Sequence, residues 1–401
     1  MTAQPTLAKI PRSIWALGLL SLFMDTSSEL VHSLLPVFMV STLGASMTSV
    51  GIVEGIAEAT ALIAKIFSGT LSDHFRKRKL LIAIGYGMAA LTKPLFPLAY
   101  SIPTVLTARF IDRIGKGIRG APRDALIGDI APQEIRGACF GLRQSLDTVG
   151  AFLGPALAIV GMLLLANNIR AVMWVAVIPA MIAFLILVFG VKEPEMKHVD
   201  KSKPPLRIRD IRHVGGAYWK LVAIAGVLTL ARFSEAFLVL KALATGLPIA
   251  YVPLVMVVMN VFYAGAAYPA GILSDRVNRK TVLLIGVAFL IAADVVLGFT
   301  ASFWMLALGV GLWGLHMAFT QGLLATMVTD TTPPELRGTA YGVFNLVCGL
   351  AMLVASVIAG LLWDKFGPSV TFFTGAAITT VALIALFMVH TDHSQETNND
   401  V

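Results

Sequence analysis

Gly69-Thr70-Leu71-Ser72-Asp73 recurs 202 positions later as Gly271-Ile272-Leu273-Ser274-Asp275. A basic cluster follows each copy, and each copy lies between two long apolar segments. Pro132-Gln133-Glu134-Ile135-Arg136-Gly137 also recurs, as Pro333-Pro334-Glu335-Leu336-Arg337-Gly338, at nearly the same spacing. Solenoid repeats recur every few tens of residues, so matches this far apart indicate that one large unit is duplicated. The sequence therefore predicts two related halves.

The composition indicates that lipid covers most of the chain. Hydrophobic residues make up 57% of the 401 residues, charged residues make up 13%, and the mean hydropathy is +0.81. A water-soluble core of ordinary proportions cannot cover so much apolar surface. Helices of about 20 apolar residues span a bilayer, and the apolar runs here are too long and too continuous for barrel strands. We expect twelve spans, at residues 14–43, 48–71, 80–100, 103–130, 138–165, 170–190, 217–245, 250–273, 280–300, 303–330, 338–363 and 369–389.

Lysine and arginine are distributed unevenly between the two sides of the expected bundle. Nineteen of the 31 basic residues fall outside the spans on one side, and only Arg170 and Lys365 fall on the other. By the positive-inside rule, this asymmetry places both termini and the central loop in the cytoplasm, with the chain in an inner or plasma membrane. Topology therefore accounts for the net charge of +8, and no nucleic-acid partner is expected.

The charge and hydropathy patterns divide the chain into four parts. We expect a six-helix bundle at residues 1–190 and a basic cytoplasmic linker at 191–216. A second six-helix bundle follows at 217–390, and a disordered cytoplasmic tail ends the chain at 391–401. The predicted fold class is thus an all-α membrane protein with twelve helices in two pseudo-symmetric bundles. A monomer is sufficient for such an arrangement.

Charged residues within the expected spans are functional candidates, because a charge at membrane depth is costly unless it is paired or faces water. The span at 103–130 has the most, and four of them follow spacings that place them on one helix face. These four are Asp112, Lys116, Arg119 and Arg123. Arg109, Arg113 and Lys116 lie nearest mid-membrane, where they either contact an anionic substrate or are neutralised structurally. The neutralising carboxylates would be Asp25, Glu29, Glu58 and Asp147.

Several carboxylates are candidates for proton coupling. Asp25 and Glu29 lie one helical turn apart, and Ser28-Glu29 matches Ser234-Glu235 in the second half. Burial raises the pKa of a carboxylate and a nearby arginine lowers it, so a carboxylate that exchanges its arginine partner can bind and release a proton. A permanent ion pair that locks the helices together is the alternative interpretation. The candidates are Asp25, Glu29, Glu58, Asp147 and Glu235.

The second half has fewer charges within its expected spans. Arg232, His316 and Gln321 are candidates for the substrate site there, although His316 and Gln321 are equally suited to packing or interhelical hydrogen bonding. His316 precedes Met317, a pair that suits copper, but the methionine content is ordinary for a membrane protein. No metal and no cofactor is therefore expected. The chain also lacks a Gly-x-x-x-x-Gly-Lys-Ser/Thr loop, which argues against ATP-driven pumping.

Twelve helices in two halves, with Gly-x-Leu-Ser-Asp and a basic cluster after the second and eighth helices, resemble the major facilitator superfamily of secondary transporters. The resemblance covers nearly the whole chain. It implies that helices 1, 4, 7 and 10 line a central cavity and that helices 3, 6, 9 and 12 lie outside. The first loop departs from the family pattern, because His74-Phe75-Arg76-Lys77-Arg78 replaces the usual Gly-Arg-Arg/Lys ending.

The resemblance also assigns a gating role to the repeated loops. Asp73 would meet the N-terminus of a helix in the other half and help to close the cytoplasmic side, since the helix dipole favours an anion there. The gating candidates are Asp73, Arg76, Arg78, Asp129, Asp275 and Arg279.

We therefore expect a secondary active transporter and not an enzyme. It would move a small organic solute, charged or amphipathic, by proton-coupled alternating access, and siderophores, drugs and organic anions suit the charged mid-membrane region better than sugars. Gly150, Gly154 and Pro155 resemble the start of the family's antiporter motif, without its closing pair of glycines. Three alternatives remain open: a transporter of transition metals or metal chelates, a substrate-sensing membrane receptor, and an integral-membrane enzyme, for which His32 is the best candidate although no nucleophile-base or metal-ligand set accompanies it.

Overall fold

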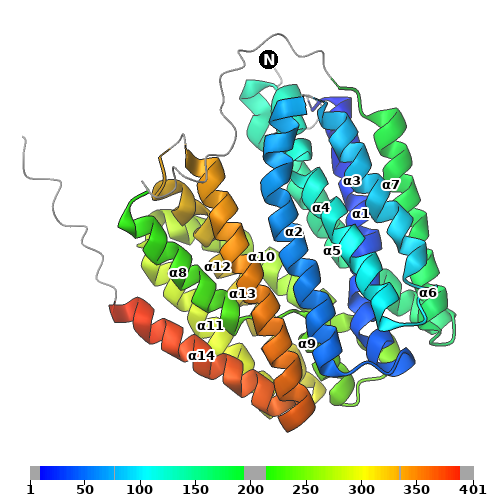
Figure 1. Cartoon of the computed structure of the whole chain (residues 1–401), viewed down its shortest axis with the longest axis vertical. Coiled ribbons are helices and arrows are strands. Elements are labelled where there is room, and N and C mark those ends of the chain that lie inside the picture. Colours follow the sequence, from blue (N-terminus) through cyan, green and yellow to red (C-terminus); the bar gives the residue numbers. More distant parts are fainter. Residues whose placement is uncertain (1–9, 76, 194–213, 334–335, 389–401) are drawn as a thin grey trace, which may run out of the picture.

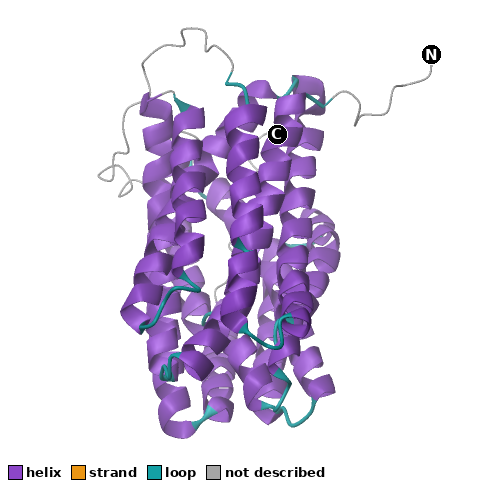
Figure 2. Cartoon of the chain, turned by 90° about the vertical axis from the view of Figure 1, so that its right-hand side faces the viewer, coloured by secondary structure: helices purple, strands orange, loops and turns teal. Residues whose placement is uncertain are grey.

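The computed structural model describes residues 10–75, 77–193, 214–333 and 336–388, and every regular element within these ranges is helical. The expected tail and most of the expected linker lie outside the described residues. Two groups of helices lie side by side, with α2 and α13 at their boundary (Figure 1). The helices of the first half run roughly alongside one another (Figure 2), and those of the second half are inclined to them (Figure 1). The predicted all-α fold in two halves is confirmed.

The first half contains helices α1 to α7. They are α1 (Arg12–Val37), α2 (Met47–Phe75), α3 (Arg78–Thr92), α4 (Ile102–Ile130), α5 (Arg136–Leu164), α6 (Ile169–Val175) and α7 (Val177–Gly190). The third span is shorter than expected, because α3 passes into a 3₁₀ turn at Lys93–Leu95 that contains Pro94. The sixth span is interrupted between α6 and α7, since Pro179 has no N–H to donate to the carbonyl of Val175.

The second half contains helices α8 to α14. They are α8 (Gly216–Ala231), α9 (Ala236–Ala244), α10 (Leu254–Arg276), α11 (Arg279–Phe299), α12 (Phe303–Asp330), α13 (Arg337–Phe366) and α14 (Pro368–Met388). Because α6 with α7 and α8 with α9 each form one interrupted span, the described helices make twelve spans. Eight spans are long and apolar enough to cross a membrane by length and composition. The other four are α2 and α4, which carry charges at membrane depth, and α3 and α14, whose described apolar segments are shorter.

The two halves pack together at one end and separate toward the other. We call the face where α1 begins and α14 ends the proximal face, and the opposite one the distal face. The largest apolar core lies toward the distal face and joins both halves, with Leu34 and Phe38 from α1 and Phe237 and Trp363 from the second half. Three smaller cores lie toward the proximal face, and each contains residues of one half only. The structure is therefore closed at the distal face.

Helices α2 and α13 run antiparallel along the boundary and approach closely at glycines. A Cβ atom at Gly360 would lie 2.5 Å from the carbonyl oxygen of Met47, and one at Gly55 would lie 2.9 Å from Leu353 Cδ1. A side chain at Gly360 would force the backbones apart, and one at Gly55 would require Leu353 to shift. This glycine-lined contact, which we call the α2–α13 seam, is the most extensive contact between the halves.

Asp364, near the end of α13, caps the N-terminus of α2. Its carboxylate accepts hydrogen bonds from the backbone N–H of Met47 at 3.0 Å, from the backbone N–H of Thr48 at 2.9 Å and from Thr48 Oγ1 at 2.6 Å. The first N–H groups of a helix have no partner within that helix, and the helix dipole favours an anion beside them. The cap thus joins the two halves at the distal face.

Candidate functional site

A break between α8 and α9 brings side chains of the second half to the centre of the boundary. Residues 232–235 leave the helix after Ala231, although they include neither proline nor glycine. The backbone N–H of Ser234 donates to Ser356 Oγ at 3.2 Å, and Ser234 Oγ accepts from the backbone N–H of Ala236 at 3.3 Å. These side-chain hydrogen bonds satisfy backbone N–H groups that have lost their helical partners, and they stabilise the break within the bundle.

A polar cavity lies at this break. Its volume of about 310 Å³ is large enough for a small organic molecule. Helices α1, α2 and α4 line it from the first half, and the break, α12 and α13 line it from the second. The lining residues are Glu29, His32, Glu58, Arg113, Lys116, Arg232, Phe233, Ser234, Glu235, Gln321 and Met352. Spans 1, 4, 7 and 10 all contribute, as the family resemblance implies.

Seven of the residues that the sequence suggested for substrate or proton binding lie together in this cavity. They are Glu29, Glu58, Arg113, Lys116, Arg232, Glu235 and Gln321. The other four, which are Arg109, Asp25, Asp147 and His316, do not line it.

Arg109 lies behind the cavity in a buried ion pair. Its guanidinium contacts Glu54 of α2 through two hydrogen bonds, Nε to Oε1 at 3.1 Å and Nη2 to Oε2 at 2.6 Å. His32 of α1 connects this pair to the cavity, because its Nε2 lies 3.6 Å from Glu54 Oε2 and its Nδ1 lies 3.5 Å from Glu29 Oε2. One charged network therefore runs from the interior of the first half to the cavity wall.

A second buried pair joins the first, third and fourth spans. Lys93 Nζ lies 2.9 Å from Asp112 Oδ1 and donates to Ser28 Oγ at 3.0 Å. Both charged side chains are nearly inaccessible, at 1% and 4% exposed. Each charge is compensated locally, so this cluster holds the helices together without a ligand.

Two cations that face the cavity have no close anionic partner. Arg113 Nη1 lies 3.5 Å from Glu58 Oε1. By contrast, the side chains of Lys116 and Arg232 form no hydrogen bond and no ion pair with the residues that the structure describes. Lys116 belongs to α4 of the first half, and Arg232 belongs to the break in the second. An anionic group bound in the cavity can therefore be contacted from both halves.

Asp147 belongs to an ion cluster closer to the proximal face. Arg143 Nη1 lies 2.8 Å from Asp147 Oδ2 and 3.6 Å from Asp124 Oδ1, and Arg123 Nη2 lies 3.8 Å from Asp147. Asp25, one turn before Glu29 in α1, interacts electrostatically with this cluster. Both carboxylates are thus close to cations but outside the cavity.

The repeated loops form matching ion pairs at the proximal face. Arg78, at the start of α3, pairs with Asp129 at the end of α4, and Arg279, at the start of α11, pairs with Asp330 at the end of α12. Corresponding members of the two pairs are 201 positions apart. In this conformation, three of the predicted gating residues therefore make contacts within their own half.

The contacts of the other three gating candidates, Asp73, Arg76 and Asp275, do not test their role. Asp275 is exposed in the last turns of α10 and forms no ion pair with the described residues. Asp73 lies on α2, but its side chain is outside the described part of the chain, as is the whole of Arg76. The gating roles of these residues stay predictions.

His316 and Gln321, the two candidates on α12, lie on different faces of that helix. His316 is 3% exposed, and its Nδ1 lies 2.8 Å from the carbonyl oxygen of Gly286 on α11. The histidine therefore packs within the second half, whereas Gln321 faces the cavity.

Two residues of the charged network, His32 and Glu54, were not among the predicted substrate or coupling residues. His32 follows Glu29 by three positions, and Glu54 precedes Glu58 by four. Residues at these spacings share a helix face, so the positions of Glu29 and Glu58 indicate that His32 and Glu54 lie beside them.

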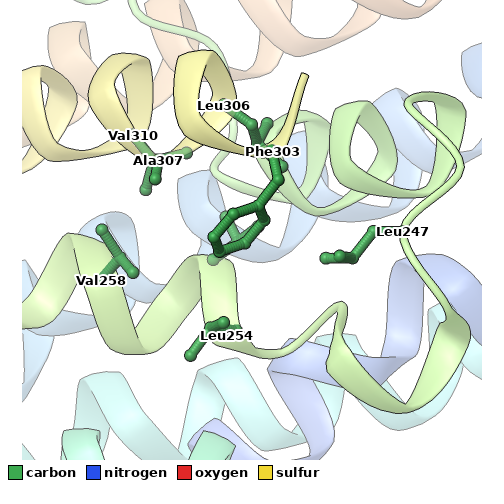
Figure 3. Close-up of a pocket in the computed structure, with 8 residues that line it drawn as sticks. Leu247, Leu254, Val258, Phe303, Leu306, Ala307 and Val310 are labelled. Atoms are coloured by element: carbon green, nitrogen blue, oxygen red, sulfur yellow. The ribbon is translucent and has the colours of Figure 1, made fainter. Parts of the chain in front are cut away.

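A separate hollow between α10 and α12 is a poor alternative site (Figure 3). Its lining is apolar and includes Leu247, Leu254, Val258, Phe303 and Leu306. Its volume of about 10 Å³ matches no more than one water molecule. It offers neither the room nor the polar groups that a solute needs, so the polar cavity is the candidate site.

Comparisons with known proteins agree with this geometry. The sequence model of the Major Facilitator Superfamily matches residues 17–250 and 223–401. An uncharacterized MFS-type transporter of Methanocaldococcus jannaschii is 32% identical over 393 residues, which cover 95% of this chain and 96% of that protein. The structure of the nucleoside transporter NupG superposes with a TM-score of 0.76 at 14% identity, covering 94% of this chain and 98% of that one. The human organic anion transporter MFSD10 superposes with a TM-score of 0.66 at 17% identity, covering 96% and 100%. With its duplicated loops, its two six-helix halves and its central polar cavity, this multi-pass membrane protein belongs to the major facilitator superfamily of transporters.

Proposed function

We propose that the protein is a secondary active transporter of a small organic solute, charged or amphipathic, that carries an anionic group. Lys116 and Arg232 support this proposal most directly, because they come from opposite halves, face one cavity and form no hydrogen bond or ion pair with the described residues. A charge at membrane depth is costly unless it is paired, and an anion bound between the two would compensate both. Since the same ligand group contacts both halves, its binding favours conformations in which the halves approach each other.

The proposed orientation places the proximal face in the cytoplasm of a cell whose inner or plasma membrane contains the chain. Basic residues concentrate in the segments on that face, as the positive-inside rule requires. The cavity then opens toward the cytoplasm in this conformation, and the distal face is closed. Residues 1–190 and 217–390 would rock about the cavity, with 191–216 as the cytoplasmic linker between them.

Protons are the proposed coupling ions, and the cavity carboxylates Glu29, Glu58 and Glu235 are the proposed carriers. Arg113 lies 3.5 Å from Glu58 in this conformation, and His32 lies 3.5 Å from Glu29. A carboxylate favours its charged form while a cation is close and binds a proton more readily when the cation moves away. Rocking of the halves would change these distances. Asp25 and Asp147 would exchange protons with the proximal side in the same way.

A transport assay with purified protein in proteoliposomes tests this proposal. Candidate solutes from a thermal-shift screen of organic acids, amphipathic drugs and ferric siderophores would be followed as flux under an imposed pH gradient. We expect flux of at least one acidic solute, stimulated by the gradient and abolished by a protonophore. Flux of neutral sugars alone, or flux of an acid that ignores the gradient, would contradict the proposal.

Removing either unpaired cation should weaken binding of the transported anion. Lys116→Ala and Arg232→Ala are each expected to raise the dissociation constant about tenfold, or about 1.4 kcal/mol, near the low end for a hydrogen bond to a charged group. Isothermal titration with the solute found by flux would measure the change. Lys65→Ala, which removes an exposed cation of α2 outside the cavity, is the matched control. Equal weakening in all three variants would argue against this anion site.

Loss of the Asp364 cap should favour opening of the distal face. Asp364→Ala removes three hydrogen bonds to α2, and loss of an N-terminal cap costs about 1–2 kcal/mol, which shifts a two-state equilibrium by roughly tenfold. Spin labels at Ser101 and Ala301, both exposed beside the distal starts of α4 and α12, would report the separation of the halves. We expect a larger long-distance population in the variant than in the wild type.

Lys365→Ala is the control for this measurement, because it changes the charge beside Asp364 without removing a contact to α2. The distance distribution of this control should match that of the wild type. An unchanged distribution in Asp364→Ala would show that the cap does not hold the distal face closed.

A further inference from the structure

The two halves can be compared residue by residue, because their proximal-face ion pairs are related by 201 positions. The same spacing relates Lys93 of the first half to Asp294 of the second, and Asp112 to Trp313. Lys93 and Asp112 form the buried pair described above. Their counterparts Asp294 and Trp313 occupy the corresponding helices α11 and α12.

The second-half positions are buried but lack the partners of their counterparts. Asp294 is 0% exposed, and neither carboxylate oxygen has a hydrogen-bond partner among the described residues. Trp313 is also 0% exposed, and its Nε1 donor is equally without a partner in the described part of the chain. In the second half, an aspartate therefore occupies the position of the lysine and a tryptophan the position of the aspartate, so the acid has no compensating charge among the described residues.

No charged group of the described residues compensates Asp294. Helices α12 and α14 pack most extensively against α11, and α10 packs against it less. His316 is the titratable residue that α12 turns toward α11, and it contacts Gly286 two turns away from Asp294. The described part of α14 has no charged residue, and the charges of α10 lie in its last turn. Lys241 of α9 lies over the ring of Phe372, and no hydrogen bond or ion pair joins it to Asp294.

An isolated ionised carboxylate is not tolerated in such surroundings, whereas a neutral carboxylic acid is. A buried aspartate without cation or donor therefore holds a proton. Because the aspartate is neutral only while it remains isolated, any rearrangement that admits water or a cation would release that proton.

Phe233 lies close both to Asp294 and to the cavity. Its side chain lines the cavity at the break, and its ring centre lies 5.5 Å from that of Trp313. At Gly375 of α14, a Cβ atom would lie 2.7 Å from Asp294 Oδ2 and 3.4 Å from the Phe233 ring. One aromatic side chain is thus near the buried acid and also lines the solute cavity, at the point where the seventh span is unwound.

We propose that Asp294 is a proton-binding site in the second half of the protein, and that it exchanges its proton with the cavity past Phe233. The site is separate from the cavity carboxylates and adds a further protonatable group to those proposed above. Its counterpart Lys93 carries a positive charge that is paired with Asp112, whereas Asp294 has no such partner among the described residues and needs a proton to be neutral.

Infrared spectroscopy of the purified protein tests the proposal without any solute. A protonated aspartate gives a carboxylic-acid C=O stretching band, which we expect at neutral pH in the wild type and expect to be missing in Asp294→Asn. Asp294→Glu should retain the band at a shifted frequency, and it serves as the second variant if Asp294→Asn does not fold. Asp112→Asn is the matched control and should leave the band unchanged, because Asp112 is ionised beside Lys93.

Transfer of the wild type into D₂O then tests exchange, which should shift this band to its deuterated position. Three results would overturn the proposal: identical spectra for the wild type and Asp294→Asn, a band that never exchanges, or a band that disappears when Na⁺ replaces K⁺, which would indicate an alkali-cation site. The measurement needs no transported solute, so failure of the proton-coupled transport proposed above would leave its outcome intact.

Discussion

Glu54→Ala is expected to lower the unfolding temperature of the purified protein by roughly 5 °C. The substitution leaves the guanidinium of Arg109 buried without its carboxylate, and removing one partner of a buried ion pair costs about 3–5 kcal/mol. The unfolding entropy is about 2.1 cal/mol/K per residue. Dividing the free energy by the summed entropy of the 401 residues gives a shift of this size. Tryptophan fluorescence of the detergent-solubilised protein during heating would measure it.

Two variants show whether the uncompensated charge is the cause. Glu58→Ala breaks the looser pair with Arg113, in which the glutamate is 33% exposed, and should cost less than about 1 kcal/mol. The double variant Glu54→Leu with Arg109→Leu removes both buried charges and should recover most of the lost stability. Equal destabilisation by Glu54→Ala and Glu58→Ala would mean that burial of the Arg109 pair is not decisive.

Glu29→Gln is expected to abolish solute accumulation driven by a pH gradient while leaving exchange of labelled for unlabelled solute intact. Glutamine retains the size and polarity of Glu29 at the cavity wall, but it cannot bind the coupling proton. Exchange requires only that the loaded protein moves between its two conformations, so it continues without net proton movement. Both activities would be measured in the same proteoliposomes, with and without an imposed gradient.

The same comparison applies to the other candidate carriers. Asp25→Asn and Glu58→Gln would be examined singly, and Glu134→Gln, at an exposed position on the proximal face, is the control that should accumulate solute normally. Undiminished accumulation by all three carrier variants would exclude coupling through these carboxylates. Loss of both accumulation and exchange would instead indicate a defect in solute binding or folding.

The fold was predictable because its signals lie along the chain. Repeated loops and long apolar runs identify the halves and the spans without knowledge of any contact. The break at residues 232–235 was not predictable, because it contains neither proline nor glycine and depends on Ser356, which is more than 100 residues away. Its position between α8 and α9 nevertheless decides which side chains of the second half reach the cavity.

The site was predictable in part. Helical spacing shows which residues share one face of a helix, but the neighbour that this face meets depends on packing. Arg109 and Lys116 share a face of α4, yet Arg109 is buried against Glu54 while Lys116 is exposed in the cavity. His316 is a polar residue within an expected span and was therefore a cavity candidate, but it contacts Gly286 within the second half. In each case, the partner helix decides the role.

The α2–α13 seam imposes an order on biosynthesis. Thr48 and Asp364, which meet at its distal end, are 316 positions apart, so α2 leaves the ribosome long before α13 exists. The ion pairs described at membrane depth, by contrast, all join residues of the first half, and they can form as soon as α5 has been inserted. The first half is thus expected to assemble before the second half is synthesised. The glycines of α2 would face lipid until α13 packs against them.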